Sequence, residues 1–178
     1  MNNEKKDNTI YQNALNKIKE DEKNKPTNYS IIIPDKPKVS GLKAYGGRFN
    51  DNHQVIKLVV GSESQVSLPS TMPKLNTTYT NNSIKIKENG VYEINYFLNV
   101  SLELATFLTL AIRNNGVKIP STIISRLVDV DVGTIYSGST IVELEEGSEI
   151  DMVIEALIMV GVTFGTGVNA SISVKKLN

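Results

Sequence analysis

Apolar and polar residues alternate along most of this chain from Gly41 onward. The stretch SIKIKENGVYEINYFLNVSL, residues 83–102, places apolar residues at positions 84 and 86 and then at every even position from 92 to 102. A period of two is the spacing of side chains that share one face of a β-strand. The pattern therefore predicts strands that each turn one face toward a core.

Asn-Gly pairs mark two turns in this pattern. Asn89–Gly90 and Asn115–Gly116 each lie between alternating runs, and both residue types accept the positive φ of a tight hairpin turn. The sequence therefore predicts a hairpin at both places. Further alternating runs cover residues 43–48, 55–60, 66–68, 123–128, 135–144, 150–158 and 168–177, and the segments DVDVG, EEGS and GVTFGTG separate the later ones.

About ten short strands with glycine-rich connections, and no helical period of useful length after residue 26, predict an all-β sandwich or barrel. A domain of about 137 residues can bury one core without a metal or a disulfide. The predicted core consists of the residues that share the inward face of these runs: Ile94, Leu98, Val100, Leu108, Leu110, Ile112, Val142, Leu144, Ile150, Met152, Ile154, Ile172 and Val174.

The N-terminal part of the chain has a different composition. Residues 1–26 are rich in Asn, Lys, Glu and Asp, and Tyr11, Leu15 and Ile18 are spaced as on a helix, so this tail is either a short helix or disordered. Residues 27–41 hold a proline-bracketed, β-branched run, which predicts an extended segment. It is either an attachment segment that adds to another protein's sheet edge or a strand of the domain itself. Its candidate attachment residues are Tyr29, Ile31, Ile32 and Ile33.

Four stretches within residues 42–178 resemble a known superfamily, and they occur in the same order. NSIKIKENGVYEINYFLNVS resembles the G-x-Y strand and its lead-in in the globular heads of the complement C-one-q and tumour necrosis factor superfamily. LTLAIRNNGVKIP resembles the next strand and turn, YSGSTIVELEEGSEIDMVI the following hairpin, and NASISVKKL the closing strand. The chain is most similar to the C-terminal jelly-roll domain of the collagen-like exosporium glycoproteins of spore-forming bacteria.

This resemblance implies a ten-stranded jelly-roll β-sandwich over residues 42–178 that assembles as a homotrimer and has no known catalytic activity. The chain has no Gly-X-Y run, so it lacks the collagen stalk of those glycoproteins. It is also similar to the stalkless proteins of the exosporium basal layer, in which case residues 1–40 would attach it to another surface or fibre protein. The resemblance implies a location on a spore or another extracellular surface, and we expect this without a recognisable signal peptide.

The composition of the chain limits the kinds of partner that we expect it to bind. The 19 basic and 19 acidic residues give no net charge, and the basic residues are scattered, so we expect no nucleic acid partner. The longest apolar run is far shorter than the roughly 20 residues of a membrane-spanning helix, so we expect no membrane insertion. The chain contains no cysteine, which excludes disulfides, thiolate metal sites and thiol nucleophiles.

The motifs that could indicate a catalytic, phosphate-binding or metal site match their patterns only in part. His53 is the only histidine and lies in a polar, turn-like stretch, so we expect a loop residue and no catalytic residue. GTGVNA, residues 165–170, matches a phosphate-binding fingerprint but precedes an alternating run, whereas that motif requires a helix. Asp129 and Asp131 have the spacing of some calcium ligands and are the metal candidates, although a turn with solvated acids is favoured. We otherwise expect no cofactor.

The most acidic stretch of the chain is STIVELEEGSEIDMVIEA, residues 139–156, which holds six carboxylates. Alternation places each acid outside the core or in the EEGS turn, where no pocket would raise one pKa for acid–base catalysis. Under the topology that the resemblance implies, Glu143 belongs to the sheet that contacts neighbouring subunits and Asp151 to the other sheet. We therefore predict Glu143 at the trimer interface, with Lys175 as a partner and Phe97 as an apolar contact.

These observations lead to two functional hypotheses. The first is a non-enzymatic, trimeric structural protein of a spore exosporium or surface fibre, attached through its N-terminal segment. The alternative is a receptor- or glycan-binding tip domain of a phage or bacterial fibre, with exposed Tyr and Asn residues in loops such as 76–82 as the contacts.

Overall fold

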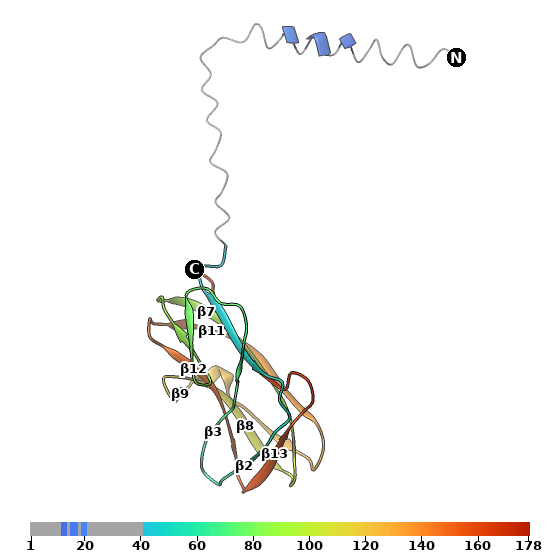
Figure 1. Cartoon of the computed structure of the whole chain (residues 1–178), viewed down its shortest axis with the longest axis vertical. Helices are drawn as coiled ribbons and strands as arrows, with labels where there is room; N and C mark the ends of the chain where they lie inside the picture. The colour runs from blue at the N-terminus through green and yellow to red at the C-terminus, as the bar shows by residue number, and fades with distance from the viewer. Residues whose placement is uncertain (1–11, 14, 18, 21–40) are drawn as a thin grey trace, which may run out of the picture. The chain divides into compact units, whose positions relative to one another are not determined.

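The alternating runs form two β-sheets in the computed structural model, which describes residues 12–13, 15–17, 19–20 and 41–178 (Figure 1). The described tail residues are helical, and Leu15 is exposed. Tyr11, Ile18 and the candidate attachment residues Tyr29 and 31–33 lie outside the described residues. No helix in the described part of the chain is long and apolar enough to cross a membrane.

Sheet A contains seven strands, with the long strand β7 at its centre. One side of β7 pairs with β11, and the other side pairs with β14 and then with β13. Beyond β14 lie β1 and β4, and beyond β13 lies β2. The strands are β1 (Tyr45–Asn50), β2 (Val55–Leu58), β4 (Ser70–Thr71), β7 (Gly90–Leu102), β11 (Thr134–Leu144), β13 (Val160–Phe164) and β14 (Ala170–Lys176).

Sheet B also contains seven strands, and all the pairings in both sheets are antiparallel. Its central strands are β8 and β12. The 3-10 turn η1 (Pro120–Thr122) precedes β10. The strands are β3 (Ser64–Gln65), β5 (Thr77–Thr80), β6 (Ser83–Ile86), β8 (Thr106–Asn114), β9 (Val117–Lys118), β10 (Ile124–Val128) and β12 (Glu149–Ala156).

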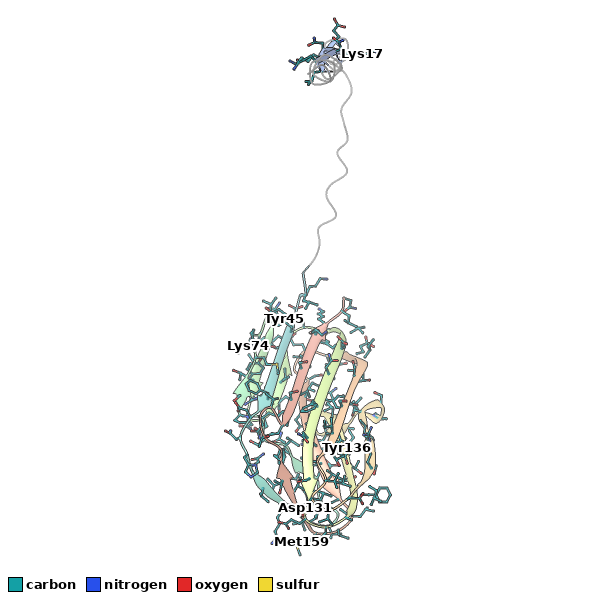
Figure 2. All side chains as sticks on the ribbon, turned by 90° about the vertical axis from the view of Figure 1, so that its right-hand side faces the viewer. Lys17, Tyr45, Lys74, Asp131, Tyr136 and Met159 are labelled. Carbon is teal, nitrogen blue, oxygen red and sulfur yellow. The ribbon has the colours of Figure 1, made fainter. Side chains whose placement is uncertain are left out.

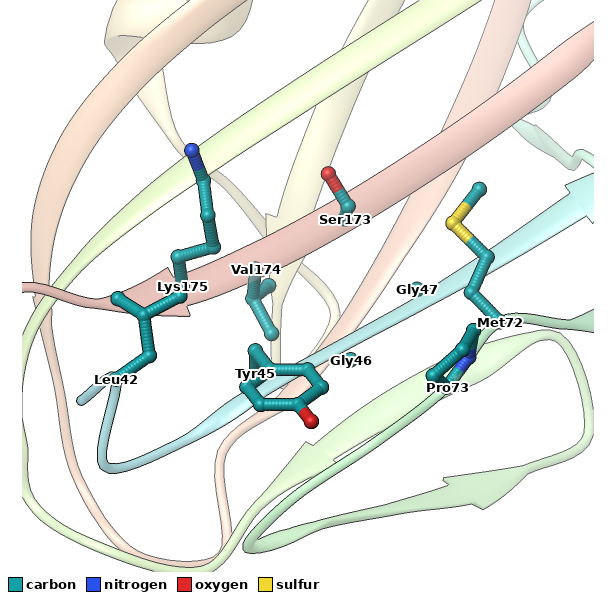
Figure 3. Close-up of a pocket in the computed structure, with 9 residues that line it drawn as sticks. All are labelled: Leu42, Tyr45, Gly46, Gly47, Met72, Pro73, Ser173, Val174 and Lys175. Carbon is teal, nitrogen blue, oxygen red and sulfur yellow. The ribbon is translucent and has the colours of Figure 1, made fainter.

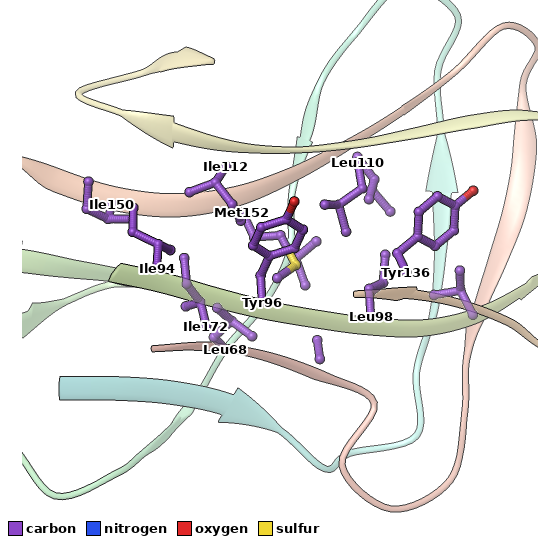
Figure 4. Packing of buried hydrophobic residues seen from close by; sticks show 14 of the residues in the cluster. Leu68, Ile94, Tyr96, Leu98, Leu110, Ile112, Tyr136, Ile150, Met152 and Ile172 are labelled. Atoms are coloured by element: carbon purple, nitrogen blue, oxygen red, sulfur yellow. The ribbon is translucent and has the colours of Figure 1, made fainter. Parts of the chain in front are cut away.

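The core lies between the two sheets, as the alternation predicts (Figure 4). Every predicted core residue except Val142 is buried. Val142 is half-buried because β11 is an edge strand, so fewer neighbours cover its inward face. The hydroxyl of the buried Tyr136 donates to the carbonyl of Leu108 at 2.9 Å, which offsets the loss of water.

The two Asn-Gly pairs have different structures. Asn115 and Gly116 both have positive φ, 51° and 81°, and they form the predicted hairpin between β8 and β9. The predicted hairpin at Asn89–Gly90 is wrong, because β6 belongs to sheet B and β7 to sheet A. This connection crosses between the sheets, and Asn89 caps the neighbouring crossing by accepting a hydrogen bond from the backbone N–H of Glu146 at 2.6 Å.

The EEGS turn is also a crossing. It joins β11 of sheet A to β12 of sheet B, so the acidic stretch 139–156 is not a hairpin. Gly147 has φ 92° in this turn, a conformation that glycine adopts without strain. The acids on β11 and those on β12 therefore have different surroundings, as the resemblance implied.

The segment GVTFGTG contains a strand that the sequence interpretation missed. β13 and β14 follow one another along the same side of β7, so the glycines at 165 and 167 shape a break between two strands and not a hairpin. Asn169 is buried in this break and donates to the carbonyls of Asn52 and Gly165. Because a strand follows, GTGVNA has no helix N-terminus and is no phosphate site.

The fold is thus the all-β sandwich that the sequence predicts. It contains fourteen strand segments among the described residues, more than the expected ten, because short segments such as β3, β4 and β9 count separately. The two ends of this domain meet: the N–H of Lys176 donates to the carbonyl of Ala44 at 2.9 Å. The four loops after β2, β7, β10 and β12 lie at the opposite end, where Figure 2 labels Asp131 and Met159.

Candidate functional site

The outer face of sheet A is the candidate site, since it contains all three residues predicted at a subunit interface. In β7 the even-numbered side chains are buried in the core, so the odd-numbered ones point outward. The register of β11, β7, β14 and β1 aligns these outward residues in rows across the sheet. The three complete rows are Ile141–Glu93–Lys175–Tyr45, Ser139–Asn95–Ser173–Gly47 and Ser137–Phe97–Ser171–Phe49.

Small side chains separate the large ones on this face. Phe97 and Phe49 are half-buried and alternate with serines in their row, so each ring lies between short side chains. On β11, at the edge of the sheet, Ile135 and Ile141 are 53% and 63% exposed. The three rows combine two phenylalanines, a tyrosine and an isoleucine with four serines and a single pair of charges. Aromatic residues and few charges are features of a protein–protein interface core, although serine is not enriched there. The chemistry of this face suits another protein surface better than a reaction.

The row that contains Lys175 is held by an ion pair. The Nζ atom of Lys175 lies 2.7 Å from a carboxylate oxygen of Glu93, and Ser139 donates to the other oxygen at 3.3 Å. The hydrogen bond from Lys175 lowers the pKa of Glu93 from its ordinary value. Sequence reasoning missed this partner, although residues 93 and 175 would have been matched by a correct register of β7 and β14.

Glu143 lies on the same face but does not contact Lys175. It is exposed near the end of β11, opposite Val91, and one row beyond the ion pair. Within one chain, therefore, Lys175 binds Glu93. The predicted contact of Glu143 with Lys175 between subunits stays a prediction.

A hollow of about 310 Å³ extends the face across β1 (Figure 3). Gly47 forms part of it because it has no side chain: a Cβ there would lie 2.5 Å from the sulfur of Met72. The lining is mostly apolar and has no pair of acids, so it suits an aliphatic or aromatic side chain. Its lining residues are Leu42, Tyr45, Gly46, Gly47, Met72, Pro73, Ser173, Val174 and Lys175.

Asp151 departs from the sequence expectation on the other sheet. It points away from the core, as predicted, yet it is only 7% exposed, because side chains on neighbouring strands cover it. Arg113 donates to both carboxylate oxygens, and the Gln65 amide donates to one of them at 2.7 Å. Arg113 and Lys118 also bind Glu63, and Lys118 binds Glu155. These charges tie β3 and β9 to the outer face of sheet B.

The remaining sequence candidates lie apart. Asp129 and Asp131 are exposed in the loop after β10, and among the residues that the structure describes no three His, Cys, Asp or Glu side chains converge as metal ligands. A calcium site there stays a prediction. His53 is exposed in a loop, and its Nδ1 lies 3.1 Å from the carbonyl oxygen of Phe164. This contact orients the ring.

Segment 76–82, the candidate glycan contact, is mostly strand β5, and the fold uses its polar groups. The hydroxyl of Tyr79 accepts from the N–H of Gly47 and donates to the carbonyl of Met72, both at 2.9 Å. Asn76 donates to Glu88 and to a backbone carbonyl, and Asn82 accepts from a backbone N–H. Asn76, Thr80 and Asn81 are nevertheless exposed, and the glycan contact stays a prediction.

Comparison with known proteins agrees with this geometry. The model of the BclA C-terminal domain family matches residues 46–178, which include every strand from β2 to β14 and all but the first residue of β1. The chain belongs to the BclA C-terminal domain family. This confirms the resemblance to the C-terminal domain of the collagen-like exosporium glycoproteins. No curated protein matches the sequence significantly.

Solved structures confirm the jelly-roll fold of this BclA C-terminal domain. The Eiger TNF structure from S. frugiperda is similar with a TM-score of 0.54 and 11% sequence identity, over 77% of this chain and 93% of that chain. The globular domain of zebrafish complement 1qA is similar with a TM-score of 0.53 and 14% identity, over 76% of this chain and 98% of that chain.

Proposed function

We propose that this BclA C-terminal domain protein is a non-enzymatic structural component of a spore exosporium or a related bacterial surface layer, and that it assembles as a homotrimer. The observation that carries the proposal is the outer face of sheet A, with its rows of small, aromatic and aliphatic side chains. The family supports the surface location, and the superfamily resemblance supports three copies.

The face offers complementary shapes for such an assembly. Ile135 and Ile141 project from the edge strand β11, while the hollow at Gly47 lies three strands away on the same sheet. A projection and a hollow at different places allow a head-to-tail contact, and repetition of that contact closes into a ring of three when neighbouring copies are related by one third of a turn. A stable specific interface buries about 1,200–2,000 Å² in total, and we expect these four strands to supply most of it.

A charge placed on the face tests the assembly. Ser137 lies beside Phe97 and is exposed in the single chain, so Ser137→Arg leaves the core unchanged but puts a long cation into the proposed interface. Ser125→Arg is the matched control, since Ser125 is an exposed serine on the outer face of sheet B. Light scattering after gel filtration should show trimers for the control and monomers for Ser137→Arg. Equal masses for the two variants would contradict this face.

Attachment through residues 1–40 is the second part of the proposal, and it rests on the apolar run at 31–33. The full chain with Ile32→Asp should keep its trimer mass but lose binding to isolated exosporium fragments, measured by co-sedimentation. Ser40→Asp, which adds the same single negative charge outside the run, is the control. Retained binding of the Ile32→Asp chain would refute attachment through this run.

A further inference from the structure

Four loops lie together at one end of the domain, opposite the end where Ala44 and Lys176 meet (Figure 2). They are residues 59–63 after β2, 103–105 after β7, 129–133 after β10 and 157–159 after β12. We call these four loops the distal tip. The tip belongs to neither sheet face, so it is separate from the proposed subunit interface.

Backbone contacts join the four loops into one surface. The N–H of Asp131 donates to the carbonyl of Leu102 at 2.9 Å, which joins the third loop to the end of β7, directly before the second loop. The N–H of Glu103 donates to Gly161 at 3.1 Å, which places the second loop beside the start of β13, directly after the fourth loop. Val160 pairs with Leu58, so the fourth loop also adjoins the first.

Aliphatic side chains dominate the tip and face solvent. Leu157 and Met159 are 69% and 59% exposed, and each of the four loops contributes at least one such residue. A folded chain rarely leaves a contiguous cluster of this kind in water unless it is a contact site. The exposed aliphatic residues of the tip are Val59, Val60, Leu104, Val130, Val132, Leu157, Ile158 and Met159.

The charges of the tip are all of one sign. Its four loops contain Glu63, Glu103, Asp129 and Asp131 and no Lys or Arg. Glu63 is paired with Arg113 and Lys118. Glu103 covers Gly161, which lies opposite Lys57 in the register of β13 and β2. Asp129 and Asp131 therefore contribute most of the remaining negative charge of the tip. This sign opposes an anionic lipid surface and the tip of a second copy, because like charges brought together repel. The loops also contain no aromatic residue on which a sugar ring could stack.

We infer that the distal tip binds a cationic amphipathic segment of a partner protein, one that presents aliphatic side chains among Lys or Arg. The aliphatic residues of the tip would cover the apolar stripe of that segment, and Asp129 and Asp131 would face its cations. The tip is formed by one chain, so its binding to a partner requires neither the trimer nor the attachment segment.

The test uses the full chain and two labelled synthetic peptides. One is an amphipathic helix of Leu and Lys, and the other carries Glu in place of every Lys. Fluorescence anisotropy at low and physiological salt should show the Lys peptide binding at least about tenfold more tightly than the Glu peptide, with the preference falling as salt rises. Equal affinity for the two peptides, or no binding of either, would overturn the inference.

Two variants locate the binding. Leu157→Ser combined with Met159→Ser should weaken binding of the Lys peptide about tenfold or more, because both residues are largely exposed and serve no core. Val117→Ser, which changes a valine that is 71% exposed in the β8–β9 hairpin, should leave it unchanged. Equal losses in both variants would refute the tip as the site.

A third variant tests the role of the acidic residues, and a vesicle assay tests whether the tip binds lipid. Asp129→Asn with Asp131→Asn should reduce the preference for the Lys peptide over the Glu peptide. Vesicles of phosphatidylcholine, with and without phosphatidylserine, should not bind the chain. Tip-dependent binding to either vesicle would replace the protein partner with a lipid surface and contradict the inference.

Discussion

Replacing Asp151 by Asn removes one charge from the cluster on sheet B while keeping the size of the side chain. The Asp151 side chain is 9% exposed and the Arg113 side chain 20% exposed, so water screens their attraction only in part. Breaking a fully buried ion pair costs about 3–5 kcal/mol. Arg113 keeps Glu63 as a second partner at 3.0 Å, so we expect a smaller loss of about 2 kcal/mol in the free energy of unfolding.

Urea unfolding followed by circular dichroism measures this loss, at one fixed protein concentration because assembly affects apparent stability. Glu149→Gln is the control, since its pair with Lys85 is more than 40% exposed on both sides and should contribute less than about 0.5 kcal/mol. Combining Asp151→Asn with Arg113→Gln should cost less than the sum of the single changes. If Asp151→Asn costs no more than Glu149→Gln, the pair is not a stabilising element and the reasoning fails.

Three further changes test other parts of the account. Hydrogen bonds from Lys118 and then from Arg113 lower the pKa of Glu63 below 4.5. The stability that ionised Glu63 contributes above that pH should therefore be lost on further acidification, and Glu63→Gln should make the free energy of unfolding, measured in urea, less dependent on pH in this range. An unchanged pH dependence in the Glu63→Gln chain would contradict the pairing. Burial raises the pKa of Tyr136 from 10.0 to about 12, so this group should lower stability by about 3 kcal/mol as pH rises through this window. Burial also raises the pKa of Tyr92 and of Tyr96, so Tyr136→Phe should reduce the alkaline loss of stability by about that amount without abolishing it. An alkaline loss of unchanged size in the Tyr136→Phe chain would contradict burial of this hydroxyl as a cause. Gly138→Ala should lower stability by about 1–3 kcal/mol, because a Cβ there would lie 2.4 Å from the Tyr96 hydroxyl, whereas Gly41→Ala has open space and should be neutral in thermal unfolding.

Alternation predicted the core because most strands bury only one face. In β7 and β14 every second residue is buried, so the sequence and the structure agree residue by residue. β13 escaped notice because Val160, Gly161 and Val162 are all buried, and a strand covered on both faces does not alternate. Asp151 likewise points away from the core, but residues distant in sequence cover it, which a period along one strand cannot reveal.

The sequence predicted the structure of the turns less well than it predicted which side of each strand is buried. Asn115–Gly116 has the positive φ values that its residue types favour, and the flanking strands pair with each other. Asn89–Gly90 has the same letters, yet its flanking strands join different sheets. Local preference decides whether a chain can turn, whereas the choice of pairing partner depends on contacts that are distant in sequence. For the same reason the pairing of Lys175 with Glu93 required the register of β7 and β14.

Sedimentation equilibrium of the full chain at micromolar concentration tests the central claim most directly. The account predicts a single species of about three times the 19.6 kDa chain mass, because the outer face of sheet A needs a partner surface to cover its aromatic and aliphatic residues. A folded species of 19.6 kDa, with an unfolding midpoint that does not change on dilution, would contradict it.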